Sequence, residues 1–359
     1  MLFLGAGASA AFGVPTLQEL TRECETVLQE GGFSTSEFEQ IRGSLTRFGI
    51  VPDFEAIFTV LQSLVAIDAS VRASGPLAAY LAHRIREQLR ESKDVARHVT
   101  ALKRMLVEKC SAVRMEDAVK HYNRLFETFA STQNVPTAPN SSTSLIGGSF
   151  LPGTPKRRTQ DIFTLNYDLL IERYFDIERI GDVLKTGFVV KGMRMFWDPR
   201  EGYQWDGRVQ STNLVKLHGS IDQVFTKQGI EKRQAPPSVG YYTTFALDDM
   251  LVFPVTEKYV TLNPYFEMHV LLRERLKAEP VCVVIGYSFR DEAVNNAFVD
   301  AIHDNTSLRI IYVGGRNATR NLADVPQIAR KASSIDMLFG IDEGLYPELE
   351  NRMKSWYPH

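Results

Sequence analysis

The sequence predicts an α/β fold in which a Rossmann-like parallel sheet, with helices on both faces, is interrupted by an inserted all-helical subdomain. Two patterns support this prediction. Short, continuously apolar segments alternate with segments of helical spacing, which is typical of a parallel sheet covered on both faces. A long stretch also has apolar residues every three or four positions, as amphipathic helices do. The length of 359 residues fits about two domains of roughly 150 residues each.

Five apolar, β-prone segments are expected to form the strands, at residues 1–4, 162–165, 214–217, 281–285 and 309–313. Strands that are apolar along their whole length are buried on both faces, so helices should cover both sides of the sheet. Helical spacing at 265–277 and 291–303 supplies two such helices. Near the N-terminus, a glycine-rich turn at residues 5–9 runs into a helix, and Pro15-Thr16 opens another.

The long helical stretch predicts an insertion into this α/β domain. Apolar stripes run through residues 54–65, 77–89 and 115–129, each with the spacing of one helix face. In the segment 131–159 that follows, 19 of 29 residues are Ser, Thr, Pro, Gly or Asn, which predicts an exposed, flexible loop. We therefore expect residues 1–24 and 158–359 to form the α/β domain, and residues 25–157 to form the helical subdomain that ends in this loop.

Charge, hydropathy and cysteine content exclude several classes of protein. With 41 basic and 43 acidic residues and a formal net charge of −2, the chain lacks the basic surplus of a dedicated nucleic-acid binder. Its longest apolar run, at 281–286, is far shorter than the ~20 residues that span a bilayer. The three cysteines (Cys24, Cys110 and Cys282) lie far apart, so a four-cysteine zinc site is ruled out and a disulfide framework is disfavoured. We expect a cytoplasmic protein without a membrane segment or a bound metal.

Small and polar residues follow four of the predicted strands, at 5–9, 166–168, 218–220 and 286–288. In open α/β sheets, ligands bind at the carboxyl ends of the strands. The first of these segments is a Gly-x-Gly turn at a helix start, where backbone amides can approach a pyrophosphate. A dehydrogenase would also place an acidic residue after a second strand about 20 residues on. Residues 21–30 instead have the pattern of a polar helix, which counts against a hydride-transfer enzyme.

Together, the four segments resemble the signature motifs of sirtuins in order and spacing. Gly5-Ala6-Gly7-Ala8-Ser9 followed by Gly13-Val14-Pro15 resembles the first signature. Thr164-Leu165-Asn166-Tyr167-Asp168 resembles the Thr-Gln-Asn-Ile-Asp motif, and Leu217-His218-Gly219-Ser220 resembles the motif with the catalytic histidine. Gly286-Tyr287-Ser288 is similar to the Gly-Thr-Ser turn that holds the adenosine half of NAD. The resemblance covers residues 1 to about 320, apart from the inserted block.

Two departures from the sirtuin pattern distinguish the chain from the deacylases. Leu17-Gln18 stands after Thr16 where the deacylases have Phe-Arg, and three scattered cysteines cannot form their zinc module. What remains is similar to the sirtuin-like NAD hydrolases of bacterial anti-phage defence, in which water replaces the acyl-lysine nucleophile. The resemblance implies hydrolysis of NAD+ to nicotinamide and ADP-ribose. Such an activity is toxic to its own cell, and the chain has little room for a sensor domain. The resemblance therefore implies control by homo-oligomer assembly or by a partner such as a HerA-type ATPase.

The resemblance also implies roles for single residues. Asn166 would hold a ribose hydroxyl and the attacking water, since its amide offers both a donor and an acceptor. His218 would accept a proton from that water, directly or through a ribose hydroxyl. Asp168 would orient or stabilise either group. The residues expected to bind NAD+ are Gly5, Ala6, Gly7, Ala8, Ser9, Pro15, Thr16, Thr164, Gly286, Ser288 and Asn317. No cofactor beyond NAD+ as substrate, and no zinc, is expected.

Simpler interpretations stay open for several of these residues. Asp168 also fits a helix N-cap or an Asx turn, Asn317 also fits ordinary turn chemistry, and Asp291 is expected only as an N-cap. Two alternative functions are a non-catalytic NAD or ADP-ribose sensor and a nucleic-acid-processing subunit. A nuclease needs clustered carboxylates and a divalent metal, and the sequence places no compact acidic cluster at a strand end, so nucleic acid is expected to be involved only indirectly.

Overall fold

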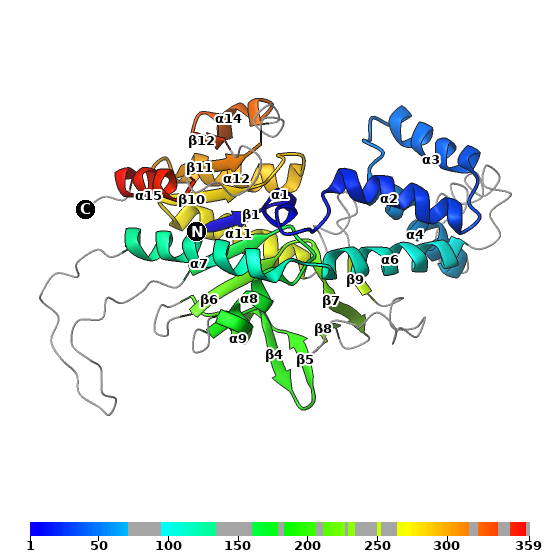
Figure 1. Cartoon of the computed structure of the whole chain (residues 1–359), viewed down its shortest axis with the longest axis horizontal. Helices are drawn as coiled ribbons and strands as arrows, with labels where there is room; N and C mark the ends of the chain where they lie inside the picture. Colours follow the sequence, from blue (N-terminus) through cyan, green and yellow to red (C-terminus); the bar gives the residue numbers. More distant parts are fainter. Residues whose placement is uncertain are drawn as a thin grey trace, which may run out of the picture.

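The computed structural model describes residues 1–70, 95–133, 160–178, 183–205, 211–226, 229–233, 250–252, 264–315, 322–336 and 345–356. A seven-stranded parallel sheet lies at its centre (Figure 1). The strands follow one another across this sheet in the order β12 (Ala332–Asp336), β11 (Arg309–Gly314), β10 (Val281–Ile285), β1 (Leu2–Leu4), β2 (Gln160–Thr164), β6 (Ser211–Lys216) and β3 (Val183–Lys185). All neighbouring pairs in this sheet are parallel.

The strand order switches direction between β1 and β10, near the middle of the sheet. From β1 the chain proceeds to β2, to the edge strand β3 and back to β6 on one side, and it later continues through β10 to β11 and β12 on the other. In open α/β sheets, the ligand crevice lies outside the carboxyl ends of the strands at such a reversal. A ligand is therefore expected at the turns that follow β1 and β10.

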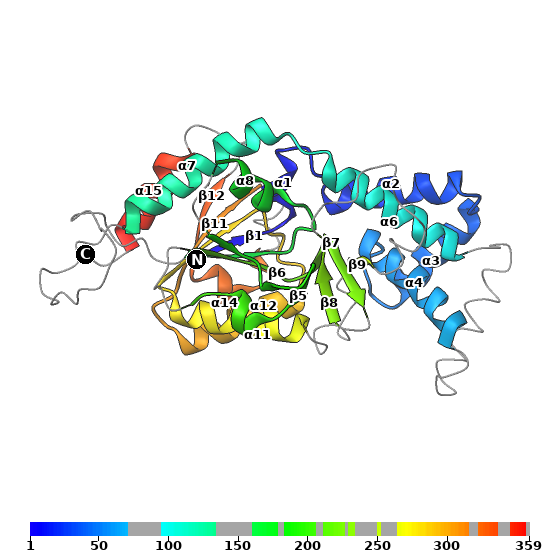
Figure 2. The same ribbon diagram turned by 90° about the horizontal axis from the view of Figure 1, so that it is seen from below.

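Helices cover both faces of the sheet (Figure 2). One face carries α11 (Tyr265–Ala278), α12 (Glu292–Asp304) and α14 (Pro326–Ala329), and the other carries α1 (Ala6–Ala10), α7 (Met115–Gln133), α8 (Leu170–Glu178) and α15 (Leu345–Trp356). Side chains alternate between the faces along each strand. Phe3 packs into the cluster on the α11 and α12 side, while Leu2 and Leu4 join the opposite cluster. The predicted α/β class, with a parallel sheet between two helical layers, is confirmed.

Beyond the carboxyl end of β1 lies a group of helices: α2 (Leu17–Glu30), α3 (Thr35–Arg47), α4 (Phe54–Ser70) and α6 (Val95–Ser111). Thr16 and Ser34 begin α2 and α3 with complete capping boxes, in which Glu19 and Glu37 bond back to the cap. Such caps fix where a helix starts. The stripe predicted at 54–65 is the buried face of α4, since Phe54, Ile57, Phe58 and Leu61 are fully buried. The stripe at 77–89 lies outside the described residues.

The predicted domain limits correspond only partly to helix ends. Helix α2 runs through the expected boundary at residues 24 and 25. Residues 131–133, expected to begin the flexible loop, are instead the last residues of α7. The rest of the segment 131–159 lies outside the described residues. The division of the chain into an α/β domain and an inserted subdomain stays a prediction.

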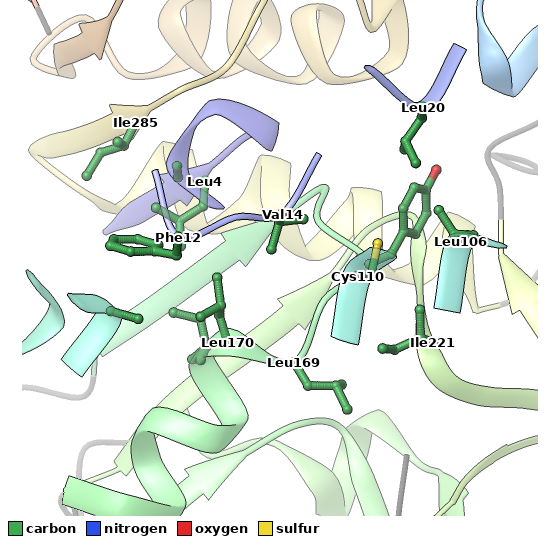
Figure 3. Close-up of a cluster of buried hydrophobic side chains, with 14 of the residues drawn as sticks. Leu4, Phe12, Val14, Leu20, Leu106, Cys110, Leu169, Leu170, Ile221 and Ile285 are labelled. Atoms are coloured by element: carbon green, nitrogen blue, oxygen red, sulfur yellow. The ribbon is translucent and has the colours of Figure 1, made fainter. Parts of the chain in front are cut away.

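A single hydrophobic cluster connects the sheet to the helical group (Figure 3). Leu4 and Ile285 contribute from the sheet, and Leu20 and Leu106 contribute from α2 and α6. The cluster also takes in the segments that follow β1, β2 and β6, through Phe12, Val14, Leu169, Leu170 and Ile221. Because close-packed interiors transmit displacements, the helical group and the strand-end turns are mechanically connected.

A second sheet, which the sequence analysis did not predict, is antiparallel. It contains β4 (Phe188–Lys191), β5 (Arg194–Trp197), β8 (Gly229–Lys232), β7 (Gly219–Thr226) and β9 (Met250–Val252), in that order. Most of these strands are three or four residues long, too short for an alternating pattern to stand out. The short helix α9 (Pro199–Gly202) follows β5. No helix in the described part of the chain is long and apolar enough to cross a membrane.

Candidate active site

The four predicted motifs meet at the carboxyl ends of neighbouring strands in the parallel sheet, called the carboxyl edge below. Strands β10, β1, β2 and β6 are neighbours, and Leu4 is in register with both Ile285 and Thr164. Thr164 is in turn in register with Lys216. The residues that follow these positions therefore lie along the carboxyl edge, next to the reversal of strand order, as expected for a binding site in this class of fold.

Asn166 connects the first two motifs directly. Its side-chain Nδ2 donates to the hydroxyl oxygen of Ser9 at 2.7 Å, and its backbone amide donates to the Thr164 hydroxyl at 3.0 Å. The side-chain oxygen of Asn166 is buried and has no hydrogen-bond partner among the described residues. Buried amide oxygens are nearly always bonded. This one is therefore available to a donor from a ligand, such as a sugar hydroxyl or a water.

His218 occupies a two-residue turn between β6 and β7 rather than a loop that leads into a helix. Its Nε2 lies 2.7 Å from a carboxylate oxygen of Asp291, and the two side chains are only 7% and 19% exposed. Burial lowers the pKa of His218, but the hydrogen bond and charge of Asp291 and the charge of Glu55 outweigh it, so the net pKa is raised. Burial raises the pKa of Asp291, yet His218 and the Val294 amide hold it at about 2.

Asp291 thus has two functions, of which the sequence indicated only one. Its Oδ1 accepts from the Val294 amide at 2.9 Å and caps α12, which confirms the predicted N-cap. Its Oδ2 is the atom that bonds His218. The backbone that presents it is constrained: Phe289 has a positive φ of 55°, and the side-chain Nδ2 of Asn295 donates to the Phe289 carbonyl at 2.9 Å. A strained conformation of a bulky residue that is held by such contacts is typical of functional turns.

Glu55, at the start of α4, is a second carboxylate near His218 that the sequence analysis missed. The Tyr167 hydroxyl donates to its Oε1 at 2.6 Å, across 112 positions of the chain. Burial raises the pKa of Glu55, while the charge of His218 and the bond from Tyr167 lower it, with a net upward shift. Glu55 comes from the helical group and Tyr167 adjoins Asn166, so the helical group contributes a side chain to this site.

Glu55→Gln should move the acidic limb of the activity profile to lower pH. The charge of Glu55 helps to raise the pKa of His218, and glutamine removes that charge while still accepting the bond from Tyr167. A base with a lower pKa stays unprotonated at lower pH. The measurement is the rate against pH for wild type, Glu55→Gln and, as a control, Glu19→Gln, a carboxylate of the α2 cap. An unmoved limb in Glu55→Gln would contradict this electrostatic link.

Glycines hold the turns after β1 and β10 against each other. Gly5 and Gly7 donate to the carbonyls of Ile285 and Gly286 at 2.9 and 3.0 Å. A Cβ atom on Gly5 would lie 2.5 Å from Tyr287 Cα, and one on Gly286 would lie 2.2 Å from the Ala8 nitrogen. The amides of Gly7 and Ala8 are both bonded within these turns. The glycines are therefore required for close packing, and their contact with a pyrophosphate stays a prediction.

Gly286→Ala is expected to destabilise the protein by about 3 kcal/mol, since it combines a positive φ with overpacking. Gly192 is the matched control, because its φ of 68° is close to the 66° of Gly286, but no atom of the described residues lies within 4 Å of its added Cβ. Gly192→Ala should cost only about 1 kcal/mol, the backbone contribution alone. Urea denaturation measures both. Equal losses in the two variants would show that the turns do not need this close approach.

The remaining predicted residues have identifiable contacts in several cases. Asp168 accepts the Leu170 amide at 3.0 Å through Oδ1, the turn-like bond of its simpler interpretation. Thr16 is engaged in the α2 capping box, next to Pro15. Ser288 lies in the turn after β10, beside Tyr287, whose hydroxyl donates to the Asp291 carbonyl at 3.0 Å. Asn317 lies outside the described residues. Ligand contacts of all these residues stay predictions.

Histidine, cysteine and carboxylate side chains do not gather into a metal-binding group of three or more anywhere in the described ranges. The three cysteines are buried thiols, and burial raises the pKa of the Cys24 and Cys282 thiols to about 12. His269, a residue of α11, lies near His218. Its Nδ1 is hydrogen-bonded to the Tyr265 carbonyl at 3.0 Å. Burial lowers its pKa, which favours the neutral imidazole.

Known proteins similar to this chain include solved Sir2 homologues, and one protein family matches the region that holds Asn166, His218 and Asp291. Among solved structures, a mutant Sir2 homologue bound to ADP-ribose is 13% identical, with a TM-score of 0.43 over 99% of this chain and 91% of that chain. A Sir2 homologue bound to NAD is also 13% identical, with a TM-score of 0.43 over 99% of this chain and 89% of that chain. No curated protein matches the sequence significantly. Residues 160–327, which include Asn166, His218 and Asp291, match the family described as the SIR2-like domain.

Proposed function

We propose that this chain is an NAD+ glycohydrolase that converts NAD+ and water to nicotinamide and ADP-ribose. The proposal rests on two groups at the carboxyl edge of the sheet. One is Asn166, whose buried side-chain oxygen has no partner in the described part of the chain, and the other is the His218–Asp291 pair. Both lie within the SIR2-like region and beside the reversal of strand order, where α/β sheets bind nucleotides.

Cleavage of the glycosidic bond requires positioning more than acid catalysis. The electron pair of the C1′–N bond returns to the positively charged nicotinamide ring, which leaves as a neutral molecule, and positive charge develops on the ribose. The protein must then hold the ribose and present a water to the face opposite the leaving group. The free oxygen of Asn166 suits this task, because Ser9 already fixes the amide group from the other side.

His218 is suited to take the proton that the water releases as its oxygen bonds to C1′. Asp291 engages Nε2, so the neutral imidazole keeps its proton on Nε2 and its lone pair on Nδ1. The lone pair can accept the proton from water, directly or through a ribose hydroxyl. The imidazolium that forms is stabilised by Asp291, whose pKa of about 2 keeps it ionised.

Control of the reaction by assembly or by a partner belongs to the same proposal. Unrestrained NAD+ loss is lethal to a cell, which is consistent with a toxic effector of anti-phage defence that is activated only when needed, for example with a HerA-type ATPase. If assembly activates the chain, nicotinamide release per protomer should rise with protein concentration as oligomers form. Full activity of the isolated monomer would contradict this part of the proposal.

The test of the activity itself is the release of nicotinamide and ADP-ribose from NAD+ by purified protein, in monomeric and assembled fractions. Release of the two products in equal amounts supports hydrolysis. Binding of ADP-ribose without any nicotinamide release would instead favour the alternative function, a sensor that uses the same turns.

A further inference from the structure

The buried ammonium group of Lys216 lies between the two segments that carry Asn166 and His218. Lys216 is the last residue of β6, two positions before His218, and its side chain is 5% exposed. Alternation along β6 places it on the same face of the sheet as Leu214, beneath α8. A buried charge of this kind is costly unless it is paired and fully hydrogen-bonded.

All three donors of this ammonium are used, which is its full capacity. Lys216 Nζ donates to the Ser220 hydroxyl at 2.7 Å, to Glu172 of α8 at 3.2 Å, and to the carbonyl of Asp168. Ser220 follows His218 by two residues, and Asp168 follows Asn166 by two. One ammonium group therefore bridges the His218 turn on both sides and also holds the Asn166 loop.

Backbone contacts reinforce the same connection. The Ile221 amide donates to the Tyr167 carbonyl at 3.1 Å, and the Ser220 hydroxyl is within 3.4 Å of that carbonyl. Ser220 is fully buried. The segments 166–168 and 218–221 are thus held as one unit, and the Lys216 ammonium is at its centre.

We propose that Lys216 is a positioning residue of the NAD+ site, because it sets the distance between the Asn166 amide and the His218 imidazole. The inference rests on the proposed function. Catalytic side chains must be held within about 0.5 Å of their productive geometry. A buried ion pair contributes little to stability compared with well-packed apolar residues, so a role in geometry accounts for a buried lysine better than a role in stability does.

A neighbouring lysine provides the matched control. Lys232 of β8 belongs to the same ionic cluster, where it pairs with Asp222 at 3.4 Å and with Glu172 at 3.9 Å. It too is largely buried, with 15% of its side chain exposed. Lys232→Met removes the same type of charge from the same cluster, but from the antiparallel sheet rather than from the segments around Asn166 and His218.

The experiment compares kcat, KM for NAD+ and Tm for wild type, Lys216→Met, Lys232→Met and Ser220→Ala. A displacement of about 1 Å can cost about 10²-fold in rate, so we expect Lys216→Met to lower kcat about 10²-fold with KM changed less than threefold. Lys232→Met should lower Tm by about as much as Lys216→Met does, but it should leave kcat within threefold of wild type. Ser220→Ala should lower kcat less than Lys216→Met does. In the double variant Lys216→Met/Ser220→Ala, kcat should be no lower than in Lys216→Met alone, because both changes break the same bridge.

Two results would overturn the inference while the proposed function stands. One is that wild type hydrolyses NAD+ and Lys216→Met does so with the same kcat. The other is an equal loss of kcat in the two lysine variants, which would assign both to stability. If Lys216→Met does not fold, the kcat of Ser220→Ala is the deciding measurement. A kcat equal to that of wild type in Ser220→Ala would overturn the inference. Wild type that releases no nicotinamide would instead refute the proposed function, and the inference with it.

Discussion

Asn166→Ala is expected to lower the kcat for NAD+ hydrolysis about 10³-fold, as the loss of a preorganised hydrogen-bonding group at a reacting centre does. The side chain is fixed by Ser9 on one side, and on the other it offers a buried oxygen that bonds to none of the residues the structure describes. Alanine removes both the contact with Ser9 and the group that orients the ribose and the water. Binding of ADP-ribose should weaken much less, since the turns after β1 and β10 are left intact. The measurement is nicotinamide release under saturating NAD+.

Asn213→Ala is the control for nonspecific damage. Asn213 is fully buried in β6 and donates to Asp161 and to the Gln204 carbonyl, both at 2.8 Å. Its loss removes these two bonds and a third, which Asn213 accepts from the Gln204 backbone amide at 3.0 Å, but at the half of the strand away from the site. We expect a lower Tm with a kcat near that of wild type. Equal activities of Asn166→Ala and wild type would exclude Asn166 from the reaction.

Asp291→Asn is expected to lower kcat about 10³-fold, because an amide in place of the carboxylate favours the wrong imidazole tautomer. The asparagine Nδ2 can donate to Nε2 of His218, which leaves the proton on Nδ1, the atom proposed to accept it. The acidic limb of the rate profile should also move to lower pH. Burial still lowers the pKa of His218, whereas the bond and charge of Asp291 that raise it are gone.

This substitution separates the two functions of Asp291. Asparagine is as good an N-cap as aspartate, so the start of α12 should be preserved and Tm should change little. Asp198→Asn is the matched control, since Asp198 likewise caps a helix, α9, and pairs with a cation, Lys191, at 3.2 Å. It should leave kcat unchanged. A wild-type rate in Asp291→Asn would reduce Asp291 to a structural cap.

The sequence was sufficient to predict five of the seven strands of the parallel sheet, all but β3 and β12, and the strand ends at which the motifs meet. Residues 281–285 are apolar throughout, and residues 310–313 are apolar after Arg309, a local pattern that identifies a strand buried on both faces. Both segments are strands of the central sheet. Adjacency of the strand ends then follows from the parallel topology. The glycines at 5, 7 and 286 were also recognisable, although the structure assigns them to packing between turns.

Asp291 and Glu55 show what could not be predicted. Each has a local interpretation that explains its position in the chain: Asp291 caps a helix, and Glu55 lies in the first turn of α4, where acidic residues are favoured. Their proximity to His218 depends on how α12 and the helical group pack against the sheet, which no local pattern encodes. The antiparallel sheet was missed for a related reason, since its short strands are specified by pairing rather than by periodicity.

The most direct test of the account is nicotinamide release from NAD+ by wild type, Asn166→Ala and His218→Ala, each measured in monomeric and assembled fractions. We predict that wild type releases nicotinamide and ADP-ribose in equal amounts in at least one fraction, and that both variants are at least about 10²-fold slower there. Equal release by all three proteins, or no release by wild type in any fraction, would contradict the central claim that these two side chains catalyse NAD+ hydrolysis.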